Sequence, residues 1–325
     1  MEYRNLGKWG MKVSVIGLGS YLTIGQQVSE SEGVQILKKA YDAGVNFFDT
    51  ANAYGEGAAE RALAKLLSGF RRDSYVLATK VWAPMGPGPN DKGLSRKHIF
   101  EQCHASLKRL NAEYIDLYQC HRYDPQTPIE ETARAMNELI VQGKVLYWGV
   151  SEWTAAQIDA ADAYCLKWGL HPPASNQPRY SLLWRNPEQE VFPYCQSKGI
   201  GQVVFSPLAH GVLSGKYRAN QPPPTGTRAA DPAQNEIMMH TYFSQEQLDK
   251  VAAMAQLARE LGVRPSQLAL AWVLCHPAVS SAITGATKTL QLEENLRAAE
   301  LKVDPETATK LNQWFPIPEK APAVP

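Results

Sequence analysis

Short apolar runs alternate with longer amphipathic segments along most of this chain of 325 residues. The runs are rich in Val, Ile, Phe and Tyr, and several are apolar on both faces, which is typical of parallel strands covered on both sides. The pattern predicts strands at 13–20, 45–50, 75–80, 114–121, 145–151, 174–180, 202–208 and 280–286. Eight strands with helices between them in one chain indicate an α/β fold, the (β/α)8 TIM barrel.

The segments between the runs carry helix start and stop signals. The segment 29–44 opens with Ser and Glu residues and stops at a glycine, as a capped helix does. Ser95 is the expected N-cap of the next helix. Pro128 and two glutamates open a further helix, which Gly143 is expected to end. These signals support the strand–helix alternation.

Three segments stand outside the alternation. The sequence "YRNLGKWGMKV" before the first strand predicts a β-hairpin around Gly7–Gly10 that covers the barrel floor. Residues 217–236 are too rich in Pro, Gly and Ala for a buried helix and predict a mobile loop. The segment 315–325 is expected to be an extended or disordered tail. We therefore expect a single barrel domain over residues 1–325.

Composition and charge exclude several classes of function. The formal net charge of +1 provides no strong basic field for a nucleic-acid backbone. The N-terminal segment is charged where a signal peptide is apolar, and no apolar run approaches the roughly 18 residues of a membrane span. The five cysteines show no C-x-x-C spacing and the seven histidines no H-x-x-x-H pair. We expect a cytoplasmic protein without membrane insertion, nucleic-acid partner or metal.

Polar residues end most of the predicted strands. They are Ser20, Asp49, Lys80, His121, Ser151, Gln177 and Ser206. A barrel carries its chemistry at the carboxyl ends of its strands, where side chains from different strands point into one bowl. Asp49, Lys80 and His121 come from successive strands, and Tyr54 follows on the loop after Asp49. Each residue alone is commonly a cap or a structural hydrogen-bonding group, but together they predict a catalytic cluster in which Lys80 is the charge partner of Asp49.

These four residue types suit the reduction of a carbonyl group. A protonated Lys80 beside Tyr54 is expected to lower the pKa of the tyrosine hydroxyl, which is ordinarily about 10. Asp49 would keep Lys80 charged and oriented, and His121 would hydrogen-bond the substrate oxygen and share its proton. Tyr54 would then act as a general acid while hydride reaches the carbon. Side chains supply no hydride, so a nicotinamide cofactor is expected.

The chain resembles the aldo-keto reductase superfamily from residue 17 to residue 295. The matching pieces, in the order of the family, are "GLGS", "FFDTANAYG", "LATK", "LYQCH", "GVSEW", "SNQPRYSLL", "FSPLAHGVLSGKY" and "ITGATKTLQLEEN". It is similar to the branch that holds the beta subunits of voltage-gated potassium channels and their bacterial relatives. That similarity rests on "EYRNLGKWGMKVS", "GLSRKHI", "SPLAHGVLSGKY" and the Q-x-x-E-N at Gln291–Asn295.

The resemblance implies NADP(H) across the carboxyl end of the barrel and a small-molecule carbonyl substrate. Tyr54 would be the proton donor, with Asp49, Lys80 and His121 completing the tetrad. The residues that it implies for the cofactor are Gly19, Ser20, Tyr21, Asp49, Ser151, Gln177, Phe205, Ser206, Pro207, Leu208, Ala209, Gly211, Ser214, Lys216, Arg228, Gly285, Thr287, Gln291, Glu294 and Asn295. Among these, Phe205 would stack on the nicotinamide, and Lys216 and Arg228 would pair with a 2′-phosphate. Tyr21, Trp82 and His121 are expected to line the substrate pocket.

The resemblance leaves two functions open: an NADPH-dependent reductase of aldehydes, with ketones as a second class, and an NADPH-binding accessory subunit of a membrane ion channel. His121 stands where the channel beta subunits carry asparagine, which favours the reductase. Glu152 stands where many members have asparagine and the channel subunits have arginine. The branch often forms tetramers or larger rings, so a homo-oligomer is an open alternative to a monomer.

Three other dinucleotide or phosphate patterns fit poorly. In "GLGSYLTIG" the third glycine of the G-x-G-x-x-G fingerprint is replaced by Leu22. In "HGVLSGKY" the phosphate-loop spacing is one residue short, and Tyr217 takes the place of Ser or Thr. Tyr194 and Lys198 have the Y-x-x-x-K spacing of short-chain dehydrogenases, but the chain contains no G-x-x-x-G-x-G.

Overall fold

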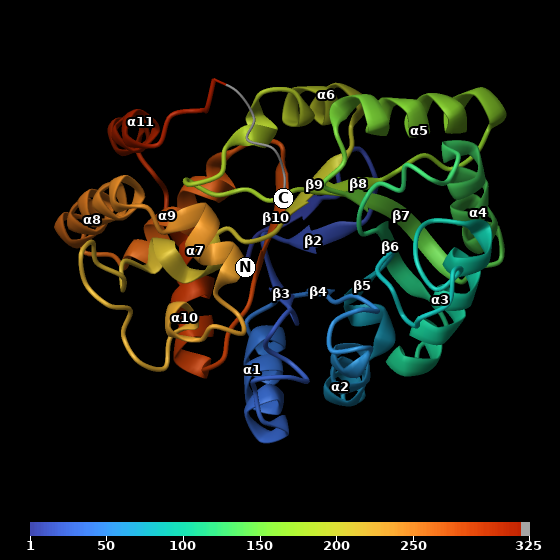
Figure 1. Ribbon diagram of the computed structural model, residues 1–325, viewed down its shortest axis with the longest axis horizontal. Coiled ribbons are helices and arrows are strands. Elements are labelled where there is room, and N and C mark those ends of the chain that lie inside the picture. The colour runs from blue at the N-terminus through green and yellow to red at the C-terminus, as the bar shows by residue number, and fades with distance from the viewer. Residues whose placement is uncertain (320–325) are drawn as a thin grey trace.

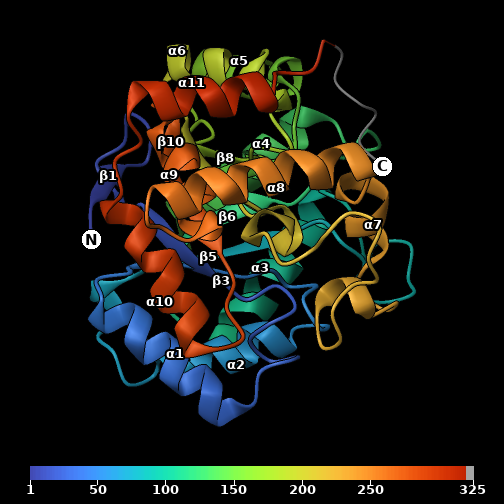
Figure 2. The same ribbon diagram turned by 90° about the vertical axis from the view of Figure 1, so that its left-hand side faces the viewer.

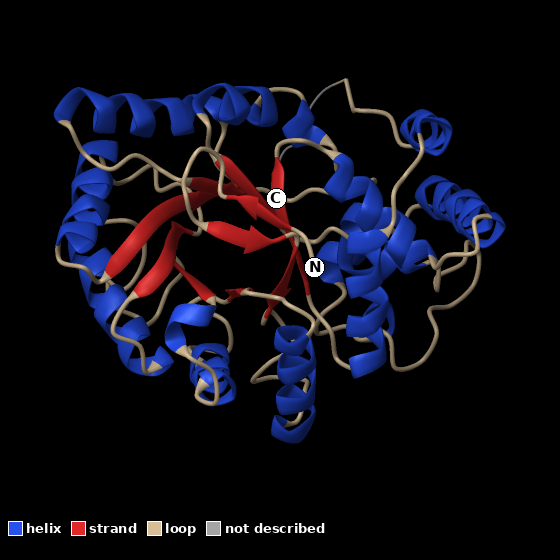
Figure 3. Ribbon diagram, turned by 180° about the vertical axis from the view of Figure 1, so that it is seen from behind, coloured by secondary structure: helices blue, strands red, loops and turns tan. Residues whose placement is uncertain are grey.

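Eight parallel strands close into a barrel in the computed structural model, which describes residues 1–319. The strands are β3 (Ile16–Gly19), β4 (Phe47–Asp49), β5 (Val76–Val81), β6 (Ile115–Cys120), β7 (Val145–Ser151), β8 (Ser175–Gln177), β9 (Gly201–Val204) and β10 (Val279–Thr284). β10 pairs with β3 and closes the ring. The predicted (β/α)8 barrel is therefore confirmed, and Figure 3 shows its strands enclosed by helices.

The helices follow the strands around the outside of the barrel (Figure 1). They are α1 (Glu30–Asp42), α2 (Ala58–Leu67), α3 (Arg96–Leu110), α4 (Ile129–Val141), α5 (Ala155–Trp168), α6 (Val191–Lys198), α7 (Glu236–Tyr242), α8 (Gln245–Glu260), α9 (Pro265–Cys275), α10 (Thr289–Arg297) and α11 (Pro305–Trp314). Figure 2 shows α7 to α11 gathered on one side, where the chain between β9 and β10 and the C-terminal helix lie.

The caps expected from the sequence begin these helices. The Ser29 side chain accepts the N–H of Glu32 at the start of α1, and the Ser95 side chain accepts the N–H of His98 at the start of α3. Pro128 directly precedes α4, and Gly143 follows its end with a φ of +70°. A left-handed φ suits glycine, which has no Cβ to collide with the carbonyl.

The N-terminal hairpin consists of β1 (Tyr3–Asn5) and β2 (Lys12–Ser14), which pair antiparallel. The single strand predicted over 13–20 is wrong, because its first residues belong to this hairpin and the barrel strand begins at Ile16. The Ser14 hydroxyl donates to the carbonyl of Ile16 at 2.7 Å, which turns the chain between the two strands.

The hairpin turn packs against the amino end of the barrel. Leu6 is fully buried, and the N–H of Lys8 donates to the Gly199 carbonyl oxygen at 2.8 Å. Gly7 has a φ of +59°, and a Cβ at this position would lie 2.2 Å from that same oxygen. Only glycine fits this approach. The prediction that the hairpin covers the barrel floor is confirmed.

The structure describes all of the predicted irregular segment 217–236 and only the first part of the predicted tail 315–325. Residues 217–236 form one short 3-10 helix, Arg228–Ala230, before α7 begins at Glu236. Residues 315–319 form no helix or strand, and 320–325 of the predicted tail lie outside the described residues. The mobility of the loop stays a prediction.

Candidate active site

Asp49 and Lys80 form a buried ion pair at the carboxyl ends of neighbouring strands. Asp49 ends β4, and Lys80 lies on β5 with no exposed surface. The Lys80 Nζ donates to Asp49 Oδ2 at 2.6 Å and to the Thr50 carbonyl at 2.8 Å. A buried charge is tolerated when it is paired and hydrogen-bonded. The partner predicted for Asp49 is thus the one that the structure places there.

Tyr54 lies in the turn between β4 and α2 and reaches the same ion pair. Its hydroxyl is 3.4 Å from the Lys80 Nζ. Burial raises the pKa of Tyr54 above its ordinary value, while Lys80 opposes this shift. The expectation that Lys80 lowers the pKa is therefore wrong for the net direction, because desolvation of the phenolate outweighs the attraction. Tyr54 retains its proton at neutral pH.

His121 follows β6, and its ring forms a T-shaped contact with the ring of Tyr54. The two ring centroids are 5.8 Å apart with an interplanar angle of 76°. Burial, assisted by the positive charges of Lys80 and Arg122, lowers the pKa of His121 well below its ordinary value. The ring is neutral at physiological pH, so it can hydrogen-bond a carbonyl oxygen but brings no extra proton, unlike the expected sharing of a proton.

Two glutamine amides fix the other oxygen of Asp49. Gln177 Nε2 donates to Asp49 Oδ1 at 2.9 Å, and Gln119 Nε2 donates to it at 3.3 Å. The Ser151 hydroxyl donates to the Gln177 carbonyl at 2.8 Å, next to the backbone pairing of these two residues. Gln119 was not predicted, although its position two residues before His121 puts it on the same strand face.

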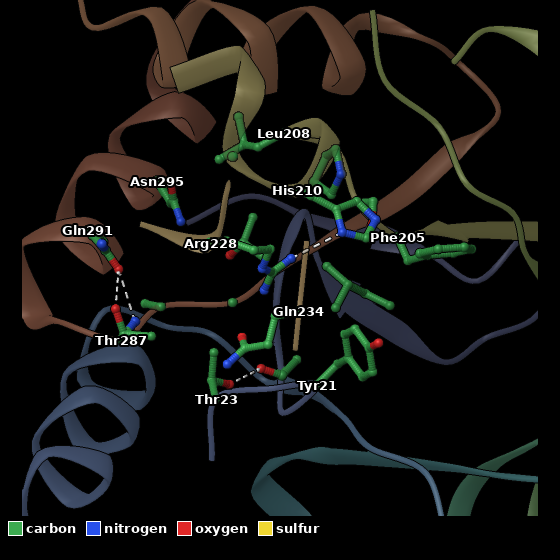
Figure 4. A pocket seen from close by; sticks show the side chains of 18 of the residues that line it. Tyr21, Thr23, Phe205, Leu208, His210, Arg228, Gln234, Thr287, Gln291 and Asn295 are labelled. Atoms are coloured by element: carbon green, nitrogen blue, oxygen red, sulfur yellow. Dashed lines mark hydrogen bonds between the residues drawn. The ribbon is translucent and has the colours of Figure 1, made fainter. Parts of the chain in front are cut away.

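A cavity of about 960 Å³ opens beside Tyr54 and extends to α10. Of the predicted residues, it is lined by Gly19, Tyr21, Asp49, Tyr54, His121, Ser151, Gln177, Phe205, Ser206, Pro207, Leu208, Gly211, Ser214, Lys216, Arg228, Gly285, Thr287, Gln291, Glu294 and Asn295. Figure 4 shows Tyr21 and Phe205 at one part of this cavity and Thr287, Gln291 and Asn295 at another. The structure therefore brings together side chains that are up to 276 positions apart, from Gly19 to Asn295.

Three predicted binding residues do not line the cavity. Ser20 is buried, and its hydroxyl donates to Thr50 Oγ1 at 2.8 Å. Ala209 has no exposed surface because it packs in the core under its own loop. Trp82 is half-buried and packs against the core between barrel and helices. For these positions the predicted contact with cofactor or substrate is not supported by the lining of the cavity.

The segment after β9 contains several residues with left-handed backbone conformations where it lines the cavity. Ser206, Ala209 and His210 have φ values of 52°, 47° and 57°, and Gly211 follows at 93°. Such left-handed residues are uncommon and cluster at ligand-binding loops. Across the cavity, the side chain of Gln27 donates a hydrogen bond to Gln234 of the loop before α7.

Arg228 projects into the middle of the cavity (Figure 4). Its Nη1 lies 3.1 Å from His210 Nδ1, and no ion pair joins Arg228 or Lys216 to a carboxylate within residues 1–319. Beyond them, the Thr287 N–H and hydroxyl both bond to Gln291 Oε1, at 2.9 and 3.1 Å. The cavity thus combines a polar far end with cations that are free to bind an anion.

We expect the protein to lose stability in acid because His210 is buried in its neutral form. Burial, followed by the charges of Arg228 and Arg179, lowers the pKa of His210 to about 3. An unfolded histidine titrates near 6.5, so between these pH values the unfolded chain binds more protons and folding is weakened as pH falls. We expect His210→Gln to lose less stability than wild type between pH 7 and pH 4, by on the order of 3 kcal/mol.

Urea unfolding at both pH values measures this difference. His240→Gln is the control, since His240 is exposed on α7. An equal acid sensitivity of wild type and His210→Gln would contradict the assignment.

The remaining motifs have structural positions. Tyr194 lies on the outer helix α6, and its hydroxyl donates to Asp159 at 2.9 Å, so the Y-x-x-x-K pair forms no site.

The described part of the chain contains no group of three or more His, Cys, Asp or Glu side chains that could hold a metal ion. None of the helices within residues 1–319 has the length and apolar character needed to span a membrane.

Some cavity residues were missed by sequence reasoning. The most informative are Arg122, Arg179 and His210. Arg122 directly follows His121, and Arg179 stands two residues after Gln177, on the same side of an extended chain. Strand alternation was the signal that could have found Arg179.

Comparison with known proteins agrees with this geometry. The model of the family described as "Aldo/keto reductase family" matches residues 15–314. A protein of Arabidopsis thaliana named "Probable voltage-gated potassium channel subunit beta" is 45% identical over 93% of this chain and 92% of its own length. Proteins of Oryza sativa subsp. japonica and Schizosaccharomyces pombe, named as probable and putative voltage-gated potassium channel subunits beta, are 43% and 42% identical. Each covers 96% of this chain, over 95% and 93% of the relative.

Proposed function

Because this chain belongs to the aldo/keto reductase family, we propose that it is an NADPH-dependent oxidoreductase that reduces aldehydes, and ketones as a second class, to alcohols. The observation that carries this proposal is the contact of the Tyr54 hydroxyl with Lys80 at the wall of the cavity, 3.4 Å apart. His121 beside Tyr54 favours the reductase over an accessory subunit, since the resemblance implies asparagine at this position in the channel subunits.

In the proposed reaction Tyr54 gives its hydroxyl proton to the carbonyl oxygen, and the Lys80 ammonium stabilises the phenolate that remains. Asp49 keeps Lys80 charged, since it raises the lysine pKa against the effect of burial. Neutral His121 donates a hydrogen bond that orients the carbonyl oxygen. When bound, a nicotinamide cofactor would supply the hydride for the carbonyl carbon, so that the proton from Tyr54 and this hydride would give the alcohol.

The residues of the cavity suit a dinucleotide phosphate. Phe205 provides an aromatic face near the tetrad, and Ser151 and Gln177 provide polar groups for a carboxamide. Ser206, Pro207, Leu208, Gly211 and Ser214 would follow the diphosphate. Thr287, Gln291, Glu294 and Asn295 would surround the adenosine, and Lys216 and Arg228 would pair with its 2′-phosphate.

Oxidation of NADPH against a panel of aldehydes and ketones tests the proposal. We expect turnover with several aldehydes and a preference for NADPH over NADH. A protein that binds NADPH but turns over none of the panel would contradict the reductase.

Arg228 is expected to set the cofactor preference. Arg228→Met should weaken NADPH binding by about 10- to 100-fold, the usual value of a hydrogen bond to a charged group, and NADH binding much less. Equilibrium binding measured by tryptophan fluorescence checks both cofactors. Arg218→Met is the control, because Arg218 is exposed on the same loop and does not line the cavity. An equal loss for NADPH and NADH would place Arg228 on a group that both cofactors share.

A second function is favoured by the names of the relatives. Since proteins 42–45% identical to this chain are named as potassium channel beta subunits, an accessory subunit that binds NADPH with little turnover is the alternative. Co-purification with a membrane channel, together with negligible turnover on the carbonyl panel, would favour it over the reductase.

Two further predictions belong to this proposal. All five cysteines are free thiols and four are buried, which suits a reducing compartment such as the cytoplasm. Homo-oligomer formation stays a prediction, and sedimentation velocity of the purified chain tests it.

A further inference from the structure

Arg179 is a buried cation at the wall of the cavity, and no carboxylate within residues 1–319 forms an ion pair with it. Only 5% of its surface is exposed, yet its guanidinium Nε and Nη1 make no hydrogen bond with any other described residue. Glu152 accepts the backbone N–H of Arg179 at 2.6 Å, and Glu188, which is nearer in the sequence, bonds to Arg185. Leaving a buried charge unpaired is costly, so such a group points to a ligand that supplies the missing charge.

The backbone directs Arg179 into the cavity. Arg179 continues the line of β8 and pairs with Phe205 in a parallel bridge beyond the end of β9. Its guanidinium lies 4.7 Å from the Trp184 ring centroid and 5.8 Å from that of Phe205. Trp184 and Phe205 are aromatic, so they hold the guanidinium in place without neutralising it.

A series of ring contacts connects the surroundings of Arg179 to His210 of the segment 206–211. The Trp184 ring is 6.5 Å from the ring of Tyr242, and the Tyr242 ring is 5.7 Å from that of His210. His210 in turn meets Arg228, as the dashed line in Figure 4 shows. Arg179 and Arg228 both line the cavity, and the charges of both help to lower the pKa of His210. The arginine whose charge acts on His121 is Arg122 and not Arg179.

We infer that Arg179 binds the diphosphate of the dinucleotide cofactor. This assignment rests on the proposed use of NADP(H). A diphosphate carries two negative charges and several acceptor oxygens, and the planar guanidinium is suited to bind them. The cost of the unpaired charge would then be offset only when the cofactor is bound.

Arg179→Met tests the assignment with two readouts. Because methionine removes an unpaired buried charge, we expect the Tm of the ligand-free protein to rise by at least about 2 °C. Affinity for NADP⁺ should fall by about 10- to 100-fold. Affinity for 2′-phospho-ADP-ribose, which has the diphosphate but no nicotinamide, should fall equally, and affinity for adenosine 2′-monophosphate should not change.

Arg185→Met is the matched control. Arg185 is equally buried and stacks on Trp272 at 5.0 Å, but its guanidinium bonds to Glu188 and to the Phe315 carbonyl. Its removal should lower Tm and leave NADP⁺ affinity unchanged.

Three results would overturn the assignment. One is equal NADP⁺ affinity of wild type and Arg179→Met, and another is a lower Tm without loss of affinity, which would mean a structural role. The third is a rise confined to the KM of a carboxylate-bearing aldehyde such as 4-oxobutanoate, which would place the substrate at Arg179. Failure of wild type to bind NADP⁺ would remove the proposed cofactor as well, so the two failures are distinguishable.

Discussion

Tyr54→Phe should slow carbonyl reduction by at least about 100-fold while NADPH still binds. The substitution removes only the hydroxyl that lies 3.4 Å from Lys80, and the ring contact with His121 remains possible. Burial raises the pKa of this hydroxyl, so the proton that the reaction needs is present throughout the neutral pH range. Without the Tyr54 hydroxyl, no other described side chain beside the carbonyl oxygen can protonate it. His121 is neutral, and Lys80 does not line the cavity.

Single-turnover measurement of NADPH oxidation, with cofactor binding measured separately, provides the test. Tyr41→Phe is a matched control, because the Tyr41 hydroxyl bonds to Ser74 outside the cavity. Near-normal hydride transfer in Tyr54→Phe with bound cofactor would show that another group is the acid.

Lys80→Met should destabilise the protein by about 3–5 kcal/mol, because it leaves the Asp49 carboxylate buried without a positive partner. Asp49 is 3% exposed, and after the substitution only the amides of Gln119 and Gln177 would remain on it. Turnover should fall as well, since the phenolate of Tyr54 would lose its stabilising charge.

Adding Asp49→Asn to Lys80→Met shows how much of the lost stability comes from the unpaired charge and how much from altered packing. In the Asp49→Asn/Lys80→Met double variant no buried charge remains, so we expect it to recover about 2 kcal/mol or more of the loss in urea unfolding. Lys38→Met is the surface control: the Lys38–Asp42 pair is more than half exposed on each side and should matter by less than about 0.5 kcal/mol. Equal stability of Lys80→Met and wild type would refute the role of the pair in folding.

Alternation of apolar runs and helix signals was sufficient to predict the barrel, and strand ends were sufficient to predict that Asp49, Lys80 and His121 lie near one another. This worked because parallel strands align their carboxyl ends, so the ends of β4, β5 and β6 had to meet. The split of the predicted strand 13–20 was not predictable in this way. Val13 and Ile16 are both apolar and buried, and only the hydrogen bond from Ser14 shows where one strand ends.

The electrostatic state of the site could not be derived from residue types. Lys80 beside Tyr54 suggested a lowered tyrosine pKa, but burial has the larger effect and acts in the opposite direction. Burial also decides the state of His121. Trp82 was expected in the substrate pocket because it follows a strand end, but it packs partly buried against the core and does not line the cavity. These outcomes depend on how many neighbours surround a side chain, which spacing along the chain does not specify.

Because the hairpin covers the amino end of the barrel, the two ends of the barrel offer different surfaces to a binding partner. Leu6 and Gly7 pack at the amino end, whereas the cavity is lined by residues at the carboxyl ends of the strands. A protein that docked on the hairpin would leave the catalytic rate unchanged, whereas one that docked over the loops around Arg228 would act as an inhibitor competing with the cofactor. The inhibition pattern of any future binding partner would therefore report which end of the barrel it occupies.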